Sequence, residues 1–356
     1  MVTGASAGVG RATARRFAAA GARLGLVARD HARLLEVQRE VEERGGRAII
    51  VVGDVADPAT TERLAAETEA AFGPIDVWVN NAMASVYSKI WEMTPDEFKR
   101  VTEVTYLGYV YGTQAALRRM LPRDRGTIVQ VGSSLAYRSI PFQSAYCGAK
   151  HAIHGFTDSL RSELIHDHKH IEVTMVQLPS MNTPQFVWVK SRLPQAAKPP
   201  APIYQPEIAA EAIFWSAHHP RREFYLGVLT SIGIKVNKLA PAFLDHYLAT
   251  RSFGKTDRKR DPDAPNNLWS PVPGDFGAHG PFNQDAKKHS TQLELSKHRV
   301  ASTLCGLGTL GVAIWGLAAL RSRGRSQPPR NSAARANGAD GFRPSMRVRH
   351  SVISAQ

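Results

Sequence analysis

Cysteine is scarce in this chain of 356 residues, which holds only Cys147 and Cys305. Two cysteines so far apart in sequence form neither a disulfide framework nor a cysteine-rich metal site. So low a content suits a reducing compartment. Three histidines near a predicted helix end, His166, His168 and His170, have no evident partner ligands. We therefore expect them to be solvated and predict no metal site.

Acidic residues are outnumbered, since 45 Lys and Arg face 31 Asp and Glu, for a formal net charge of +14. The excess is uneven, because the stretch from Arg321 to Arg349 holds eight arginines and one acid, Asp340. Such a tail is typical of solvated or membrane-surface charge rather than of a surface that reads DNA. We predict no nucleic-acid partner.

Short apolar runs alternate with helical segments over residues 1–250. This alternation, with short connections, predicts an α/β fold of the Rossmann-like type: a doubly wound parallel sheet with helices on both faces. The hydrophobic content of 43% supports a substantial core. The expected strands are 23–28, 48–52, 75–79, 128–133, 171–178 and 222–226, and the expected helices include 11–20, 33–44, 60–72, 206–218 and 232–250, the last interrupted at Pro241.

A glycine-rich turn opens the chain and leads directly into the first expected helix. Gly4, Gly8 and Gly10 follow Thr3 with the spacing Gly-x-x-x-Gly-x-Gly. Glycines let the backbone approach a phosphate closely, while the N–H groups and positive end of the helix attract the anion. Similar turns also serve helix packing alone, so this motif by itself is a weak indication of a dinucleotide site.

The strand expected at 23–28 is followed by Arg29 and Asp30, about where folds of this kind meet the adenosine ribose. An acid there binds the ribose hydroxyls, whereas a cation accommodates a 2′-phosphate. Because Arg29 comes first, we favour NADPH as cofactor and keep NAD as the second choice. The alternative is that Arg29 is a solvated residue at the start of the next helix.

Tyr146 and Lys150 stand four residues apart and would project from the same face of a helix. A free tyrosine titrates near pH ~10, and an ammonium within a few Å would favour the phenolate and lower that pKa. The lower pKa would bring the phenol towards the range of efficient general acid-base catalysis. On its own this spacing also fits an ordinary half-exposed helix.

Together these motifs resemble the short-chain dehydrogenase/reductase family. The resemblance covers residues 1–250 and rests on Thr3 to Gly10, Asp54, Asn80 to Ala82, Ser133 and Tyr146-x-x-x-Lys150, in that order and spacing. It implies alcohol/carbonyl chemistry in which a serine hydrogen-bonds the substrate oxygen, Tyr146 transfers the proton and Lys150 holds the nicotinamide ribose. Strand register and spacing favour Ser133 as that serine, with Ser134 as the alternative. It also implies homodimers or homotetramers, and NAD(P) contacts from Gly4, Ser6, Gly8, Val9, Gly10, Arg29, Asp54, Val55, Asn81, Ala82, Tyr146, Lys150, Pro179 and Thr183.

Four positions depart from that family's pattern. Thr105 stands where the family places the asparagine of its catalytic group. The role of that asparagine includes a backbone carbonyl that holds a water, and the Thr105 carbonyl can still offer this contact. Met83 replaces a glycine and should narrow the approach to the cofactor, and Ser180 replaces another. The first strand is reduced to Met1 and Val2 where about five residues are normal. We expect the true start to lie upstream.

The segment 184–205 carries Phe186, Trp188 and several prolines. In the family that the chain resembles, this insertion covers the substrate, so an apolar cover favours a lipophilic substrate. The alternative is a loop packed on its own domain. Residues 251–299 are rich in Pro, Gly, Asp and Asn, which is typical of an irregular extension or a tether.

Residues 300–320 contain no charged side chain and are numerous enough to cross ~30 Å of hydrocarbon. We predict a C-terminal hydrophobic helix that spans a membrane there, with a buried globular helix as the alternative. Residues 321–356 are expected to form a disordered basic tail. Because the glycine-rich turn begins within two residues of Met1, we expect no signal peptide and a catalytic domain on the cytoplasmic side.

Two functions from different classes fit these observations. The first is a membrane-associated NADP(H)-dependent oxidoreductase that interconverts an alcohol and a ketone or aldehyde on a lipophilic molecule. The second is a non-catalytic nucleotide-binding or scaffold protein of the same fold, suggested by Thr105 and Met83. The presence of Ser133, Tyr146 and Lys150 together favours the first.

Overall fold

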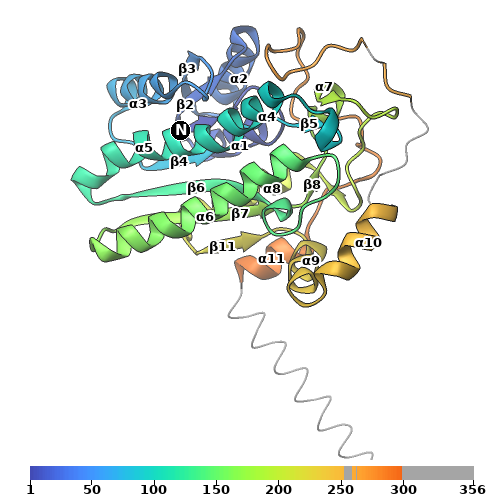
Figure 1. The fold of residues 1–356 in the computed structure, drawn as a ribbon. Coiled ribbons are helices and arrows are strands. Elements are labelled where there is room, and N and C mark those ends of the chain that lie inside the picture. The colour runs from blue at the N-terminus through green and yellow to red at the C-terminus, as the bar shows by residue number, and fades with distance from the viewer. Residues whose placement is uncertain (252–258, 262, 299–356) are drawn as a thin grey trace, which may run out of the picture. The chain divides into compact units, whose positions relative to one another are not determined.

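The computed structural model describes residues 1–251, 259–261 and 263–298 (Figure 1). Its main sheet has seven parallel strands in the order β11-β7-β6-β4-β1-β2-β3. This confirms the predicted Rossmann-like sheet. The strand order changes direction between β1 and β4, and folds of this kind bind ligands at this switch point. The strands are β1 (Val2–Thr3), β2 (Arg23–Ala28), β3 (Arg47–Val52), β4 (Val77–Asn80), β6 (Gly126–Ser133), β7 (Ile171–Leu178) and β11 (Glu223–Tyr225).

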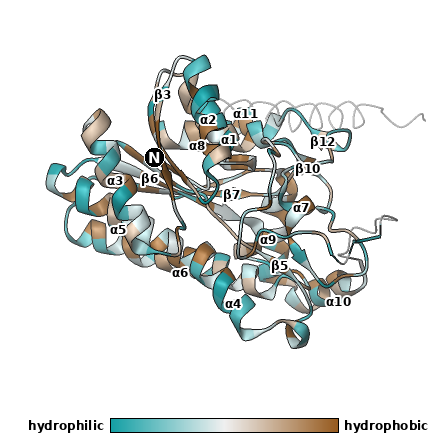
Figure 2. Cartoon of the chain, turned by 90° about the horizontal axis from the view of Figure 1, so that it is seen from above, coloured by the Kyte–Doolittle hydropathy of each residue, from teal (hydrophilic) through white to brown (hydrophobic). Residues whose placement is uncertain are grey.

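Helices cover both faces of this sheet, and each face has its own cluster of buried apolar side chains. Along β2, Leu26 belongs to one cluster and the next residue, Val27, belongs to the other, because successive side chains of a strand point to opposite faces. Figure 2 shows apolar residues on the strands and on the inner helix faces. One face carries α1 (Gly8–Ala18), α2 (His31–Glu43) and α8 (Pro206–His218); the other carries α3 (Pro58–Phe72), α5 (Gly108–Met120) and α6 (Ser144–His166).

The first strand is as short as the sequence indicates, yet it pairs on both sides. Val2 lies opposite Leu26 of β2 and opposite Val79 of β4. Two residues are thus sufficient to join the two halves of the sheet and to deliver the following glycine-rich turn to the switch point. The upstream start stays a prediction.

Smaller elements, most of them from the chain beyond β7, lie over one end of the sheet. β8 (Ser180–Met181), β10 (Ile203–Tyr204) and β12 (Ala286–Lys287) form a three-stranded parallel sheet, and β5 (Val86–Tyr87) pairs with β9 (Lys190–Ser191). Between β8 and β9 lies the short helix α7 (Gln185–Trp188). Because β12 belongs to the extension after residue 250, this part of the extension packs on the sheet domain instead of leaving it as a tether.

Four further helices complete the described chain. α4 (Pro95–Thr102) precedes a π-helical turn at Glu103–Leu107, and α11 (Thr291–Lys297) ends the described extension. The expected break at Pro241 is confirmed, because it separates α9 (Val228–Leu239) from α10 (Pro241–Arg251). Proline removes a helix hydrogen bond but is tolerated in a first turn.

The predicted membrane span, 300–320, and the basic tail, 321–356, lie outside the described residues. Within residues 1–251, 259–261 and 263–298, every helix falls short of the length or the hydropathy that a bilayer crossing requires.

Candidate active site

A cavity of about 330 Å³ lies at the carboxyl ends of the central strands. It receives residues from the glycine-rich turn, from the ends of β2, β3, β4, β6 and β7, and from α6 and α7. Two predicted site residues, Gly10 and Thr105, are not in its wall. The predicted residues that do line it are Gly4, Ser6, Gly8, Val9, Arg29, Asp54, Val55, Asn81, Ala82, Ser133, Tyr146, Lys150, Pro179 and Thr183.

The glycine-rich turn is shaped as a cradle in which added side chains would not fit. Gly4 has φ +66°, and a Cβ on it would lie 2.8 Å from the Cα of Ala82. A Cβ on Gly10 would lie 2.1 Å from the carbonyl oxygen of Gly4, so Gly10 shapes the turn from behind the cavity. The Asn81 amide holds the same turn by donating to the carbonyl oxygen of Thr3 (3.0 Å).

Helix α1 begins in this cradle and has neither a side-chain N-cap nor an acidic residue in its first turn. The first N–H groups of a helix lack partners within it and carry the positive end of the helix dipole. Such a terminus suits a diphosphate group. The cradle and this helix start, which has no side-chain cap, therefore fit the dinucleotide that the family resemblance implies.

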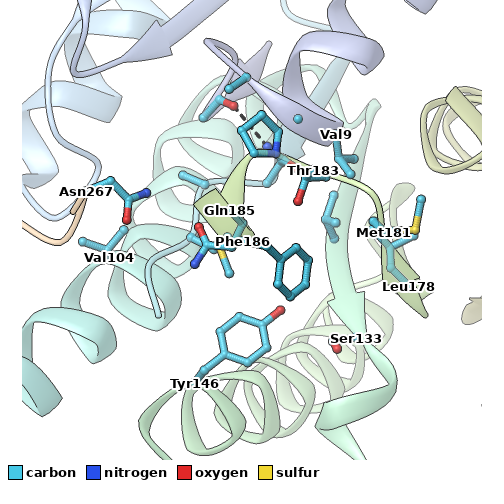
Figure 3. A pocket seen from close by; sticks show the side chains of 18 of the residues that line it. Val9, Val104, Ser133, Tyr146, Leu178, Met181, Thr183, Gln185, Phe186 and Asn267 are labelled. Carbon is cyan, nitrogen blue, oxygen red and sulfur yellow. Dashed lines mark hydrogen bonds between the residues drawn. The ribbon is translucent and has the colours of Figure 1, made fainter. Parts of the chain in front are cut away.

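The structure brings Ser133 and Tyr146 together. Ser133 ends β6 and accepts a hydrogen bond at Oγ from the Leu135 N–H (3.1 Å), and the Tyr146 phenol comes near its hydroxyl from the first turn of α6. Figure 3 shows both hydroxyl groups in the cavity, near the ring of Phe186. Two hydroxyl groups placed side by side can both contact one substrate oxygen.

Lys150 also lies in this wall, and its hydrogen bonds go to groups other than the phenol of Tyr146. Its Nζ donates to the carbonyl oxygen of Val131 (2.8 Å) and to the hydroxyl of Tyr109 (3.1 Å). The same Nζ is 5.6 Å from the centroid of the Tyr146 ring. Sequence reasoning missed Tyr109, because no motif links a residue of α5 to Lys150.

The predicted lowering of the Tyr146 pKa is wrong for this structure. Burial raises the pKa of Tyr146, and the nearby Ser133 hydroxyl opposes that rise only in part. Burial also lowers the pKa of Lys150 to about 7. Desolvation disfavours the charged forms of both groups, so at neutral pH the amine provides less positive charge than the sequence argument assumed.

Thr105 lies in the π-helical turn and is fully buried behind the cavity wall. Its Oγ1 donates to the carbonyl oxygen of Ala84 (2.9 Å) and accepts from the Ala84 N–H (3.0 Å). The hydroxyl therefore fastens the loop after β4 and does not face the reaction site. Its neighbour Val104 lines the cavity instead. The proposed role of the Thr105 carbonyl stays a prediction.

Arg29 lines the end of the cavity where the adenosine would lie. Its guanidinium donates to backbone carbonyls of the extension, those of Trp269 (3.0 Å), Leu268 (3.3 Å) and Asn267. Burial lowers the pKa of this group. Arg29 is therefore not a merely solvated residue, and Asp30 is the one that caps α2, by accepting from the Arg33 N–H (3.0 Å).

Asp54 lies beside Arg29 in the same wall and is already ion-paired. Its Oδ2 bonds the guanidinium of Arg100, and its Oδ1 accepts from the Ala56 N–H (3.0 Å). Asp54 is thus paired with Arg100, while the hydrogen bonds of Arg29 go to neutral carbonyl oxygens.

The other end of the cavity is mostly apolar. Met83, predicted to narrow the approach, is in its wall, together with Phe186 and Trp188 of the expected cover. Lining residues that the sequence did not indicate include Tyr87, Val104, Leu135, Ile140, Gln143, Asn267 and Pro271. Several of them lie beside a motif residue, but Asn267 and Pro271 come from the distant extension, where no local pattern marks them.

A parallel sheet with this cradle at its switch point, and with serine, tyrosine and lysine in one wall, defines an NAD(P)-dependent oxidoreductase. Residues 1–192 match the family described as short chain dehydrogenase. The chain belongs to that family.

Relatives and a solved structure agree with this assignment. The chain is 36% identical over 250 residues to the uncharacterized oxidoreductase YxnA of Bacillus subtilis (strain 168), covering 70% of each protein. It is 32% identical over 236 residues to a fatty acyl-CoA reductase of Acinetobacter baylyi, covering 65% of this chain and 77% of the relative. An alcohol dehydrogenase from Thermococcus sibiricus, solved with 5-hydroxy-NADP, superposes with a TM-score of 0.54 and 26% identity, over 63% of this chain and 93% of its own.

Proposed function

We propose that this chain is an NADP(H)-dependent oxidoreductase that interconverts an alcohol and a ketone or aldehyde on a lipophilic substrate. The observation that carries the proposal is the placing of the Ser133 and Tyr146 hydroxyl groups close together in a cavity that also contains the start of α1, which has no side-chain cap. The pair provides a proton donor and a second hydrogen-bond donor for one substrate oxygen.

Each catalytic residue has a distinct task in the reductive direction. Tyr146 gives its proton to the carbonyl oxygen, and its raised pKa keeps it protonated for that step at neutral pH. Ser133 donates a hydrogen bond to the same oxygen while negative charge develops on it. When bound, the nicotinamide ring supplies the hydride in reduction and accepts it in oxidation. We expect Lys150, which Tyr109 and Val131 hold in the cavity wall, to bond the nicotinamide ribose.

Turnover separates this function from the alternative of a non-catalytic nucleotide-binding protein. In Tyr146→Phe, NADPH oxidation with a panel of carbonyl compounds should collapse while NADPH still binds. Tyr111→Phe is the matched control, because that half-buried tyrosine is outside the cavity wall. An unchanged rate in Tyr146→Phe would overturn the catalytic assignment.

The preference for NADPH rests on the charge of Arg29. Its hydrogen bonds go to neutral carbonyl oxygens, so its positive charge is not neutralised by those contacts and can attract a 2′-phosphate. The likeness to a structure solved with 5-hydroxy-NADP supports this choice. Arg29→Ala should weaken NADPH binding more than NADH binding; equal weakening would remove Arg29 as the selecting residue.

The lipophilic substrate is suggested by the apolar residues Met83, Leu135, Ile140, Phe186 and Trp188 around the reaction site and by the relative named fatty acyl-CoA reductase. In a series of linear aldehydes, kcat/KM should rise with chain length, since each buried methylene contributes about 0.8 kcal/mol. A preference for short, polar carbonyl compounds such as sugars would contradict this assignment.

Membrane association belongs to the same proposal. The uncharged segment 300–320 is its basis. The full chain should float with liposomes, and Leu310→Arg should reduce that binding. Equal flotation of both proteins would place the attachment elsewhere.

A further inference from the structure

Residues 266–283, here called the crossing segment, contact the cofactor cleft from outside the nucleotide-binding half. Asn267 and Pro271 reach the cavity wall. Figure 3 shows the side chain of Asn267 beside Val104, across the cavity from Ser133. The segment follows the catalytic sequence motifs by more than a hundred residues, so its place in this wall comes from tertiary contacts alone.

Arginines of the nucleotide-binding half hold the crossing segment along its length. In addition to the contacts of Arg29, the Nε of Arg100 donates to the Leu268 carbonyl (3.1 Å). The Nε of Arg33 donates to the Gly274 carbonyl (2.6 Å). Further on, the Arg11 guanidinium pairs with both carboxylate oxygens of Asp275, one of them at 3.1 Å.

The crossing segment is also packed into the core. Leu268 is fully buried and belongs to the same apolar cluster as Val55 and Val104, which line the cavity. At Gly280 there is no space for a side chain, since a Cβ would lie 2.4 Å from the Thr183 carbonyl oxygen. Burial and close contact of this kind are typical of a domain interior rather than of a loosely attached tail.

Backbone hydrogen bonds join the crossing segment to both sides of the phosphate end of the cleft. The Gly277 carbonyl accepts from the Gly8 N–H (3.2 Å) in the glycine-rich turn. On the other side, the Gly280 N–H donates to the Asn182 carbonyl (3.1 Å), and the Phe282 N–H donates to the Asn182 side chain (3.0 Å).

The same segment holds α7, the helix over the substrate end. The Asn267 N–H donates to the Trp188 carbonyl (2.9 Å), and the Asn267 amide, oriented to satisfy both groups, accepts from Trp188 Nε1 (2.8 Å). Phe276 packs edge-on against Trp188 with ring centroids 4.7 Å apart, and Phe282 does the same against Phe186 at 5.9 Å.

We propose that the crossing segment is a fixed wall of the active site that holds the adenosine end and the substrate cover in one arrangement before any ligand binds. Asp275 and Leu268 are its anchors to the nucleotide half, and Asn267 is its contact with α7. The inference deepens the proposed function and rests on it, since it takes NADPH to occupy the cleft.

Hydrogen exchange of the unmodified protein without cofactor tests whether the wall is already formed. The amides of Gly280 and Phe282 should be protected, because both donate to Asn182, a group of the protein itself. Exchange as fast as in an unstructured peptide would overturn the proposal, whether or not the protein turns over a substrate.

NADPH affinity of two variants tests the contribution of the wall to binding. Leu268→Ala and Asp275→Asn should each raise the NADPH Kd about tenfold. For Asp275→Asn the direction of the change in Kd is decisive. Asp275 is an acid near the start of α1, so if charge alone mattered, its removal would lower the Kd for an anion such as NADPH. Asp263→Asn, an exposed acid of the same extension, is the control and should bind as the unmodified protein does.

The outcomes separate this inference from the proposed function. If Leu268→Ala fails to fold, Asp275→Asn decides, since it removes one carboxylate that is itself 44% exposed and leaves the apolar core unchanged. An unchanged or lower Kd in Asp275→Asn overturns the fixed wall and leaves the oxidoreductase assignment intact. If the unmodified protein binds no NADPH, the proposed function fails. Hydrogen exchange at Gly280 and Phe282 still tests whether the crossing segment is a fixed wall.

Asn267→Ala tests the link to the substrate cover. It removes the amide contact with Trp188 and should raise the KM for the carbonyl substrate several-fold more than the Kd for NADPH. A proportional change in both constants would show that the segment acts on the cofactor alone and would overturn the coupling to α7.

Discussion

The ammonium group of Lys150 donates to the phenolic oxygen of Tyr109, 3.1 Å away on the neighbouring helix α5. This bond and the bond to the Val131 carbonyl (2.8 Å) fix where the amine points. The centroid of the Tyr146 ring is 5.6 Å from the same nitrogen. Tyr109→Phe should lower kcat/KM about tenfold, because it removes a hydroxyl that accepts from Lys150 and donates to the Val131 carbonyl (2.9 Å). A change confined to thermal stability, with the pH profile of kcat/KM unmoved, would show that Tyr109 only fills space.

The buried amine of Lys150 should make stability depend on pH. Its pKa is about 7 in the folded protein against 10.5 for the free side chain. Between these two pH values Lys150 is protonated in the unfolded chain and neutral in the folded protein, so the free energy of unfolding rises with pH. Below about pH 7 Lys150 is protonated in both states, and its effect on stability no longer changes with pH. Relative to Lys150→Met, the unmodified protein should gain unfolding free energy from pH 7 to pH 9.5. Parallel curves in urea unfolding would contradict the low pKa.

Cofactor binding should take up a proton near pH 7.5. A dinucleotide brings negative charge and ribose hydroxyl groups to Lys150, which raises the pKa of an amine that starts at about 7. Affinity for NADPH should therefore fall as pH rises above 7. Calorimetry in buffers of different ionisation enthalpy measures the proton directly, and Lys150→Met should abolish the uptake.

The hydroxyl of Thr105 should matter for stability and not for chemistry. Thr105→Val leaves the Ala84 N–H and carbonyl without their partner, which should lower the free energy of unfolding by about 1–3 kcal/mol. Thr102→Val, whose hydroxyl bonds the Phe98 carbonyl at the surface, should change it by less than about 0.5 kcal/mol. A large loss of kcat in a Thr105→Val protein of normal stability would return the hydroxyl to the proton relay.

Two glycine substitutions should act in opposite directions. Gly10→Ala forces a Cβ to within 2.1 Å of the Gly4 carbonyl oxygen, so NADPH binding and stability should both fall. Gly155→Ala, at an open and exposed position in α6, should stabilise the protein by about 1 kcal/mol. Thermal unfolding and fluorescence titration with NADPH measure both effects; tight binding by Gly10→Ala would show that the turn can relax.

Local sequence patterns predicted the elements and the motif residues because hydrophobic period and motif spacing are local properties. Ser133 and Tyr146 share a wall because Ser133 ends β6 and Tyr146 lies in the first turn of α6, at the same edge of the sheet. The prediction of a lowered Tyr146 pKa is wrong because burial raises this pKa, while the Lys150 amine is bonded to Tyr109. Asn267 was missed because its contact with Arg29 spans 238 residues, and no short pattern encodes a pairing at that distance.

The long separation between Arg11 and Asp275, 264 residues, also fixes the order in which parts of the molecule can form. On the ribosome, the strands of the sheet emerge well before the partner of Arg11 has been synthesised. Refolding in vitro should show the same sequence of events, with secondary structure recovered ahead of the ability to retain NADPH, since contacts this distant along a chain close slowly.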